Sequence, residues 1–325
     1  MLCCLGMTDE LVFLLRERYT QEKIGFTVKK ALLIDGHNIL FKYFLGMPRV
    51  FTSVDGRAVH GAYGMIGALL KTIQRFQPER VVVCFDTAVP SERVELLSTY
   101  KANRPQFFAE GENPFEQIDI VYDSLRYLSL SYLSIEGVEA DDLIGSYARL
   151  LERDYEVIIL SADRDYLQLV NERISLCVQR GKNETLFTPE LVKEQFGVEP
   201  DQFVDYKALI GDSSDNIKGV PGIGPKTAAQ LLQQYGSLEQ VYLRLAELKP
   251  KMAATLQEYE QRLQINRRIV AIQDQYPVDQ LLLTELDSQK ILHLSVRQVF
   301  IQLGVFQEKI VAQKMVVKDP VEEGK

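Results

Sequence analysis

The sequence lacks several features that would place it in other protein classes. No apolar run approaches the ~18 residues that a membrane-spanning helix needs. Residues 1–30 hold only the short apolar run 11–15 and have neither a basic start nor a small-residue cleavage site, which disfavours a signal peptide. The four cysteines form no Cys-x-x-Cys pair, which favours incidental or buried thiols in a reducing cytoplasm.

The chain also lacks an excess of positive charge. Its formal net charge is −8 and its isoelectric point is about 5.2, which taken alone disfavours a nucleic-acid partner. Nine of its acids are assigned below to one metal site, and setting them aside leaves +1 for the rest of the chain. The net charge therefore does not exclude DNA, because the distribution of charge decides.

Three short aliphatic runs, residues 31–35, 81–86 and 157–163, each end in an aspartate. Such runs are typical of strands that are buried on both faces of a parallel sheet. Helical patterns at 62–76 and 116–130 alternate with them and predict an α/β doubly wound fold. Ligands of such sheets bind at the carboxyl ends of the strands, so the three aspartates are expected to converge. Aspartate also caps helices, an alternative that we favour for one strand but not for three.

After about residue 188 the pattern becomes mainly helical. The predicted helices cover 189–196, 201–210, 226–235, 237–245 and 252–272. We expect four parts: an N-terminal extension 1–28, an α/β core 29–188, a helical domain 189–310 and a tail 311–325. A segment near 93–117, with Pro105, Gly111 and Pro114, is expected to project from the core.

Further acids form three clusters, of which the second begins with one of the strand-end aspartates. The clusters are Glu139-Ala140-Asp141-Asp142, Asp163-Arg164-Asp165 and Asp212-Ser213-Ser214-Asp215. Helix capping explains one or two of these acids, but so many like charges oppose folding unless cations offset them. Oxygen ligands favour Mg²⁺ or Mn²⁺, and zinc is a poor candidate because the clusters contain no His or Cys. No EF-hand pattern supports calcium binding. A two-metal site of this kind suits phosphodiester hydrolysis.

Residues 219–229 form the most specific local pattern. The glycines permit close backbone approach, and a helix beginning at Pro225 presents N–H groups that bind phosphate. The residues expected to contact a DNA backbone are Gly219, Gly222, Gly224, Lys226 and Thr227. This is the pattern of a helix-hairpin-helix, and the alternative is an ordinary glycine-containing turn between helices.

Together these motifs resemble one known family. Over roughly residues 29–310 the chain is similar to the 5′–3′ exonuclease domain of bacterial DNA polymerase I, within the flap-endonuclease family. The matching elements are residues 33–38 (LIDGHN), 83–86 (VCFD), 100–105 (YKANRP), 138–142 (VEADD), 161–165 (SADRD), 208–216 (ALIGDSSDN) and 219–229. The run 106–114 departs from the family, and no polymerase sequence follows, so we expect a free-standing nuclease or a fragment.

The resemblance implies roles for individual residues. It implies a parallel-sheet core of PIN-like or resolvase-like type that binds two divalent cations, with potassium at the hairpin. The metal ligands would be Asp35, Asp86, Glu139, Asp141, Asp142, Asp163, Asp165, Asp212 and Asp215, with Asp35 and Asp86 also catalytic. Lys101 and Arg104 would contact the scissile phosphate at the base of the family's helical arch. Tyr100 would stack on a base, and Arg93 matches a further basic position.

We therefore predict a metal-dependent 5′–3′ exonuclease and structure-specific 5′-flap endonuclease that acts on DNA in replication and repair. It is expected to be a monomeric bacterial protein, cytoplasmic and associated with the nucleoid, that works beside a separate DNA polymerase. Two alternatives stay open at this stage. One is a non-catalytic, structure-specific DNA-binding module, and the other is an RNA-directed nuclease of the same fold.

Overall fold

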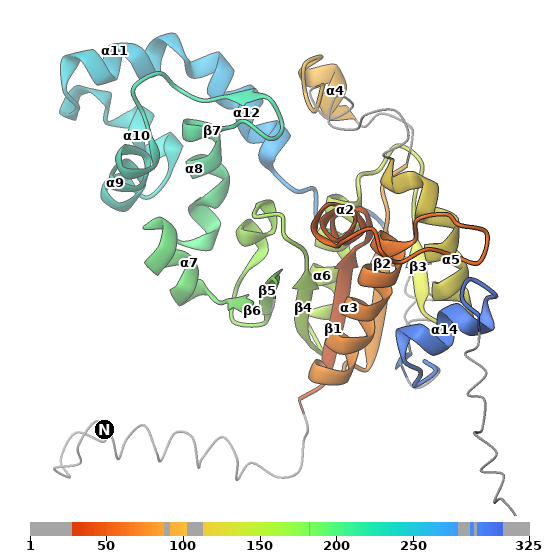
Figure 1. Ribbon diagram of the computed structural model, residues 1–325. Coiled ribbons are helices and arrows are strands. Elements are labelled where there is room, and N and C mark those ends of the chain that lie inside the picture. Colours follow the sequence, from red (N-terminus) through yellow and green to blue (C-terminus); the bar gives the residue numbers. More distant parts are fainter. Residues whose placement is uncertain are drawn as a thin grey trace, which may run out of the picture.

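The structure is a computed structural model that describes residues 28–87, 92–102, 113–181, 183–278, 287–288 and 291–307. A six-stranded sheet has helices on both faces, and a second, helical region lies beside it (Figure 1). Arg104, the predicted extension before Val28 and the predicted tail 311–325 lie outside the described residues.

The sheet confirms the predicted α/β fold class. Its strands are β1 (Lys30–Asp35), β2 (Arg80–Cys84), β3 (Ser131–Leu133), β4 (Glu156–Leu160), β5 (Ile174–Arg180) and β6 (Asn183–Phe187). They lie in the order β3-β2-β1-β4-β5-β6, and only β6 runs antiparallel to its neighbour. The three predicted strands are neighbours within the sheet, which explains why their sequences are so uniformly aliphatic.

Alternate residues of β1 face two different hydrophobic cores. Leu32 and Ile34 pack with the helices α2 (Gly36–Gly46), α3 (His60–Phe76) and α5 (Ile118–Tyr127). Ala31 and Leu33 point to the other face, where α6 (Ala140–Leu151) packs. The period of two along a strand therefore divides the aliphatic run between both layers of helices. The helix α14 (Val296–Gln302) packs against α3.

The second region consists mainly of helices and shares the hydrophobic core on the α6 face. Its α-helices are α7 (Pro189–Phe196), α8 (Phe203–Ile210), α9 (Pro225–Tyr235), α10 (Leu238–Leu243), α11 (Pro250–Glu258) and α12 (Glu260–Val270). The single helix expected over 252–272 is interrupted at Tyr259, so that α11 buries Leu256 near α10 while α12 packs on α8. No helix in the described ranges is long and apolar enough to cross a membrane.

The strand order sets the position of the acids. From β1 the chain runs to β2 and β3 on one side and then crosses to β4 on the other, so the order reverses beside β1. In open α/β sheets this switch point forms a crevice at the carboxyl ends of the strands. Asp35 is the last residue of β1, Asp86 follows β2 and Asp163 follows β4.

A short hairpin holds the last acidic cluster. Its strands β7 (Gly211–Asp212) and β8 (Ile217–Lys218) pair antiparallel and enclose Ser213–Asn216. Gly211 has φ +77, and a Cβ atom there would lie 2.3 Å from the backbone nitrogen of Gly219. A Cβ atom on Gly219 would lie 2.3 Å from the carbonyl carbon of Ile210. The two glycines let the backbones touch and so position the loop.

Replacing Gly219 by alanine is expected to destabilise the protein by about 1–3 kcal/mol, because the added methyl group meets backbone that cannot move aside. The matched control is Gly46→Ala at the exposed end of α2, where a Cβ atom has nothing within 4 Å. Thermal unfolding followed by circular dichroism should give a lower Tm for Gly219→Ala and a nearly unchanged Tm for Gly46→Ala. Equal Tm values would contradict the packing described for β7 and β8.

Candidate active site

Asp35 lies at the centre of the acidic crevice. Its Oδ1 caps α2 by accepting a hydrogen bond from the backbone N–H of Asn38 (3.1 Å). Its Oδ2 accepts a hydrogen bond from the Ser161 hydroxyl (2.9 Å). The side chain is buried. Burial, together with the charges of Asp86 and Asp163, raises its pKa to about 7.

Tyr166 connects Asp35 to Asp141. The tyrosine hydroxyl lies 2.5 Å from Asp141 Oδ1 and 3.3 Å from Asp35 Oδ2. One hydroxyl proton cannot serve two carboxylates, so the trio is best satisfied when one carboxyl group holds a proton of its own. Consistent with this, burial and the neighbouring charges of Asp163, Asp35 and Asp86 raise the pKa of Asp141 well above its usual value.

Lys101 joins the chain segment after Leu96 to the crevice. Its Nζ lies 2.6 Å from Glu139 Oε2, at the start of α6, and its backbone amide donates to the carbonyl of Asp215 (3.1 Å). Asp86 accepts a hydrogen bond from the Ala140 amide (2.8 Å) at the same helix start. Burial raises the pKa of Asp86, but hydrogen bonding and the charge of Lys101 outweigh it and set that pKa to about 2.

On the other side of the crevice Lys207 bridges two acids. Its Nζ lies 2.6 Å from Asp165 Oδ1 and also pairs with Asp212. Burial and the charge of Asp163 raise the pKa of Asp165 to about 7 despite the lysine. The amide of Asp165 donates to Asp163 Oδ1 (2.9 Å), which holds the second cluster together.

Asp142 is bound by an arginine of the protein, whereas the sequence predicts that it is a metal ligand. Both of its carboxylate oxygens accept hydrogen bonds from the guanidinium of Arg93, at 2.7 and 2.8 Å. Its Oδ1 also accepts a hydrogen bond from the backbone N–H of Gln273. Arg93 is only 3% exposed and also donates to backbone carbonyls. The geometry therefore does not support the expected contact of Arg93 with DNA, since its donors are already used inside the protein.

Tyr100 also differs from its expected role in stacking on a base. Its ring is buried in a small apolar cluster with Ile217, Ile269 and Val270. Its hydroxyl lies 3.3 Å from Glu139 Oε2, and burial raises the pKa of the phenol. In this arrangement the ring packs with Leu96 and Leu97 of the preceding segment and presents no free face to a nucleobase.

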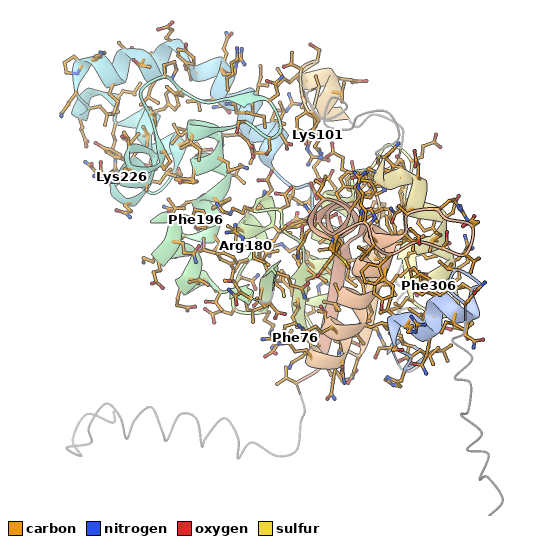
Figure 2. The ribbon with its side chains drawn as sticks, viewed as in Figure 1. Phe76, Lys101, Arg180, Phe196, Lys226 and Phe306 are labelled. Atoms are coloured by element: carbon orange, nitrogen blue, oxygen red, sulfur yellow. The ribbon has the colours of Figure 1, made fainter. Side chains whose placement is uncertain are left out.

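The glycine hairpin at the start of α9 lies outside the crevice. Val220 and Ile223 anchor it in the core, whereas Gly222, Gly224 and Lys226 are exposed. Gly222 has φ +80, and the N-cap Gly224 provides no side chain to occupy the first N–H groups of α9. Figure 2 shows Lys226 on α9 in the helical region, well apart from Lys101, which lies between α4 (Glu92–Leu96) and the end of α12.

The oxygen donors of the crevice are of the type that divalent cations prefer, but the side chains are not spaced as metal ligands. In the described part of the chain, no three acidic, histidine or cysteine side chains have the spacing of a metal site. Lys101, Lys207 and Tyr166 contact carboxylate oxygens of Glu139, Asp165 and Asp141. The oxygen-only donors, their burial and the raised pKa values of Asp35, Asp141 and Asp165 fit a site that cations would stabilise.

Two residues of the crevice were missed by the sequence reasoning. Tyr166 directly follows Asp165, but a tyrosine after an acidic motif has no distinctive spacing. Lys207 is 8% exposed in α8, five residues before Asp212. A lysine in a helix whose other residues, apart from Asp205 and Tyr206, are apolar was a usable signal, because a buried ammonium requires acidic partners.

Family models match most of the chain. Residues 30–197 match the 5′-3′ exonuclease, N-terminal resolvase-like domain, and residues 198–291 match the 5′-3′ exonuclease, C-terminal SAM fold. A thermostable DNA polymerase I of Thermus thermophilus is 37% identical over 254 residues, and DNA polymerase I of Bacillus subtilis is 32% identical over 255. Each match covers 77% of this chain but only 29% and 28% of those polymerases, so the chain spans less than a third of their length.

Solved structures share the fold. A bacteriophage T5 5′-exonuclease with bound divalent zinc ions has a TM-score of 0.64 and 22% identity, over 85% of this chain and 99% of that one. A bacteriophage T5 flap endonuclease, in a pseudo-enzyme-product complex with DNA and metal ions, has a TM-score of 0.65 and 23% identity over the same shares. At these identities the likeness establishes the fold, while the family models establish membership. The chain belongs to the 5′-3′ exonuclease family.

Proposed function

We propose that this protein is a divalent-metal-dependent, structure-specific 5′ nuclease that hydrolyses DNA phosphodiesters at 5′ ends and flaps. The observation that carries the proposal is the convergence of acids from four parts of the chain on one crevice. They come from the strand ends, from the start of α6, from the Asp163–Asp165 turn and from the β7–β8 hairpin. Membership of the 5′-3′ exonuclease family supports the same function. The bacteriophage T5 flap endonuclease, which shares the fold, is bound to DNA and metal ions in its solved structure.

Mg²⁺ or Mn²⁺ is the inferred ion, because every candidate ligand is a carboxylate oxygen. The residues that would hold the ions are Asp35, Asp86, Glu139, Asp141, Asp163, Asp165, Asp212 and Asp215. When bound, such ions activate water and stabilise negative charge on a phosphate. Asp142 is left out of this set because Arg93 occupies both of its oxygens.

The chain's own cations would complete the site. Lys101 Nζ is half-buried against Glu139, from where a short side-chain movement brings it to a phosphate at the crevice mouth. A cation placed there stabilises the charge that develops in the transition state. Arg104 is proposed to assist Lys101, three residues earlier in the chain. Tyr166 would orient Asp35 and Asp141 through its hydroxyl.

DNA would be held along its backbone by the hairpin before α9. The exposed N–H groups of the first turn, with Lys226 and Thr227, form a phosphate site that reads no bases. A potassium ion at the turn carbonyls is part of the proposal. We also propose that the nuclease acts as a monomer and that a DNA polymerase works separately on the same DNA.

Asp163→Asn is expected to reduce Mg²⁺-dependent cleavage of a 5′-flap by at least about 100-fold while DNA binding persists, because it removes one ligand charge without changing shape. The matched control is Asp154→Asn, an exposed acid after α6. Cleavage of 5′-labelled DNA measures activity, and a gel shift in EDTA measures binding. Wild-type cleavage by Asp163→Asn would contradict the site, and DNA binding without any cleavage by the wild type would favour a non-catalytic module.

Product mapping tests the substrate. Flap, nicked and blunt DNA, together with an RNA flap of equal length, should be cut only with Mg²⁺ or Mn²⁺, and the 5′-branched DNA should be cut fastest. This order is expected because the hairpin contacts duplex backbone and the crevice accepts a phosphate near a free 5′ end. Faster cleavage of the RNA flap than of the DNA flap would overturn the DNA assignment.

The metal-free protein is expected to be less stable at pH 8 than at pH 5.5. The folded-state pKa values of Asp35 and Asp165 are about 7, above the ordinary 3.8. The protonated form of each carboxyl group therefore contributes its full stabilisation below pH 3.8. This contribution is lost as the pH rises from there through about 7. Thermal unfolding in EDTA should show the loss, and Asp35→Asn should reduce it.

Mg²⁺ should raise the Tm more at pH 8 than at pH 5.5, because cations bind the deprotonated acids of the folded state. Asp154→Asn should behave like the wild type at both pH values. An equal effect of Mg²⁺ at both pH values would contradict the assignment of these acids as its ligands.

A further inference from the structure

Arg93 occupies a position that joins three separate parts of the protein. It lies on α4, at the beginning of the projecting segment, yet its side chain is buried. Its guanidinium donates through Nη1 and Nη2 to the two oxygens of Asp142, in the planar two-point geometry that arginine favours. Nη1 also lies 3.5 Å from Glu139 Oε1, an acid of the crevice.

The remaining donors of Arg93 reach the end of α12. Nε donates to the carbonyl of Ile269 (2.8 Å), and Nη2 donates to the carbonyl of Ala271 (2.9 Å). Carbonyls at the end of a helix have no partners within the helix and carry partial negative charge, so a guanidinium suits them. Four of its five N–H groups are thereby used inside the protein.

The same region contains the residues that place Lys101. Leu96 and Leu97, which follow Arg93, pack with Tyr100 against Ile217 and the end of α12. Both Tyr100 and Lys101 then contact Glu139 through its Oε2 atom. The stretch from Arg93 to Lys101 is thus held against Glu139 at both of its ends.

We propose that Arg93 is a positioning residue for the nuclease reaction. By pinning α4 to Asp142 and to the end of α12, it sets the position of Lys101 relative to Glu139 and the other acids. It acts through Asp142 and contacts no DNA phosphate. The inference rests on the proposed nuclease function and adds a link between the helical region and the base of the projecting segment.

The rival role is direct contact with a DNA phosphate, and the two roles differ in measurable ways. A phosphate contact contributes to DNA affinity and to its salt dependence, with a slope in log Kd of about 0.9 for each neutralised phosphate. A positioning residue changes the rate of the bound complex and leaves affinity and salt slope unchanged. Misplacing a supporting residue of a metal site typically costs about 10–100-fold in activity.

The experiment compares Arg93→Gln, Arg93→Lys, Asp142→Asn and the double variant Arg93→Gln/Asp142→Asn with the wild type. Single-turnover cleavage of a 5′-flap with saturating protein gives the rate of the bound complex. DNA binding in EDTA between 50 and 200 mM salt, a range chosen to resolve such slopes, gives Kd and its salt dependence. Lys226→Ala, on the exposed hairpin, is the control for loss of a phosphate contact.

Arg93→Gln and Asp142→Asn are each expected to slow single-turnover cleavage about 10–100-fold with an unchanged Kd and salt slope. The double variant should be no slower than the slower single variant, because both changes break one unit. Arg93→Lys, which keeps the charge but not the two-point geometry, should recover only part of the rate. Lys226→Ala should instead weaken binding and lower the salt slope.

A lower salt slope and weaker binding for Arg93→Gln, as for Lys226→Ala, would overturn the proposal, and so would a wild-type rate. If Arg93→Gln does not fold, Arg93→Lys and Asp142→Asn carry the same comparison. Hydrogen exchange of residues 93–101 and 269–273 provides a readout without cleavage, and it should quicken in both segments together. If the wild type itself cuts no DNA, the proposed function fails, while coupled exchange still supports the link that Arg93 makes.

Discussion

Repulsion among buried carboxylates is the constraint on which the rest of the structure depends. The carboxyl ends of β1 and β4, the start of α6 and the β7–β8 hairpin bring these acids into one crevice. Lys101 and Lys207 supply positive charge to the crevice, and Tyr166 lies within reach of Asp35 and Asp141. The raised pKa values of Asp35 and Asp165 indicate that this internal compensation is incomplete. The proposed function follows from the convergence of these acids, since hard divalent cations are the ions that such a crevice binds best.

A second consequence is that the crevice is shared between parts that are distant in the sequence. Lys207 belongs to the helical region and pairs with Asp165 of the α/β core. Arg93 connects α4 to α6 and to the last turn of α12. Both regions also share one hydrophobic core on the α6 face of the sheet. The helical region therefore contributes to the acidic crevice as well as presenting the exposed hairpin.

Much of the architecture could be predicted from sequence where a pattern is strong and local. The strands β1, β2 and β4 are largely aliphatic because they are covered on both faces, and an aspartate of the crevice ends β1 and follows β2 and β4. The strand β3 was not predicted, since it has only three residues, all partly exposed. The hairpin of β5 and β6 forms one edge of the sheet. The strand β6 has only five residues, too few to show a clear alternation of buried and exposed positions. Tyr259, where one expected helix becomes two, carries no glycine or proline signal.

The sequence by itself determined the α/β class, the family resemblance and the set of acids, because these depend on residue type and local spacing. Only the tertiary structure decided which acids face one another and which already have partners. Asp141 and Asp142 are adjacent in the chain, yet one lies against Tyr166 in the crevice while the other is bound by Arg93. The physical reason is that successive residues of a helix point in different directions, so the neighbours of each side chain come from other elements.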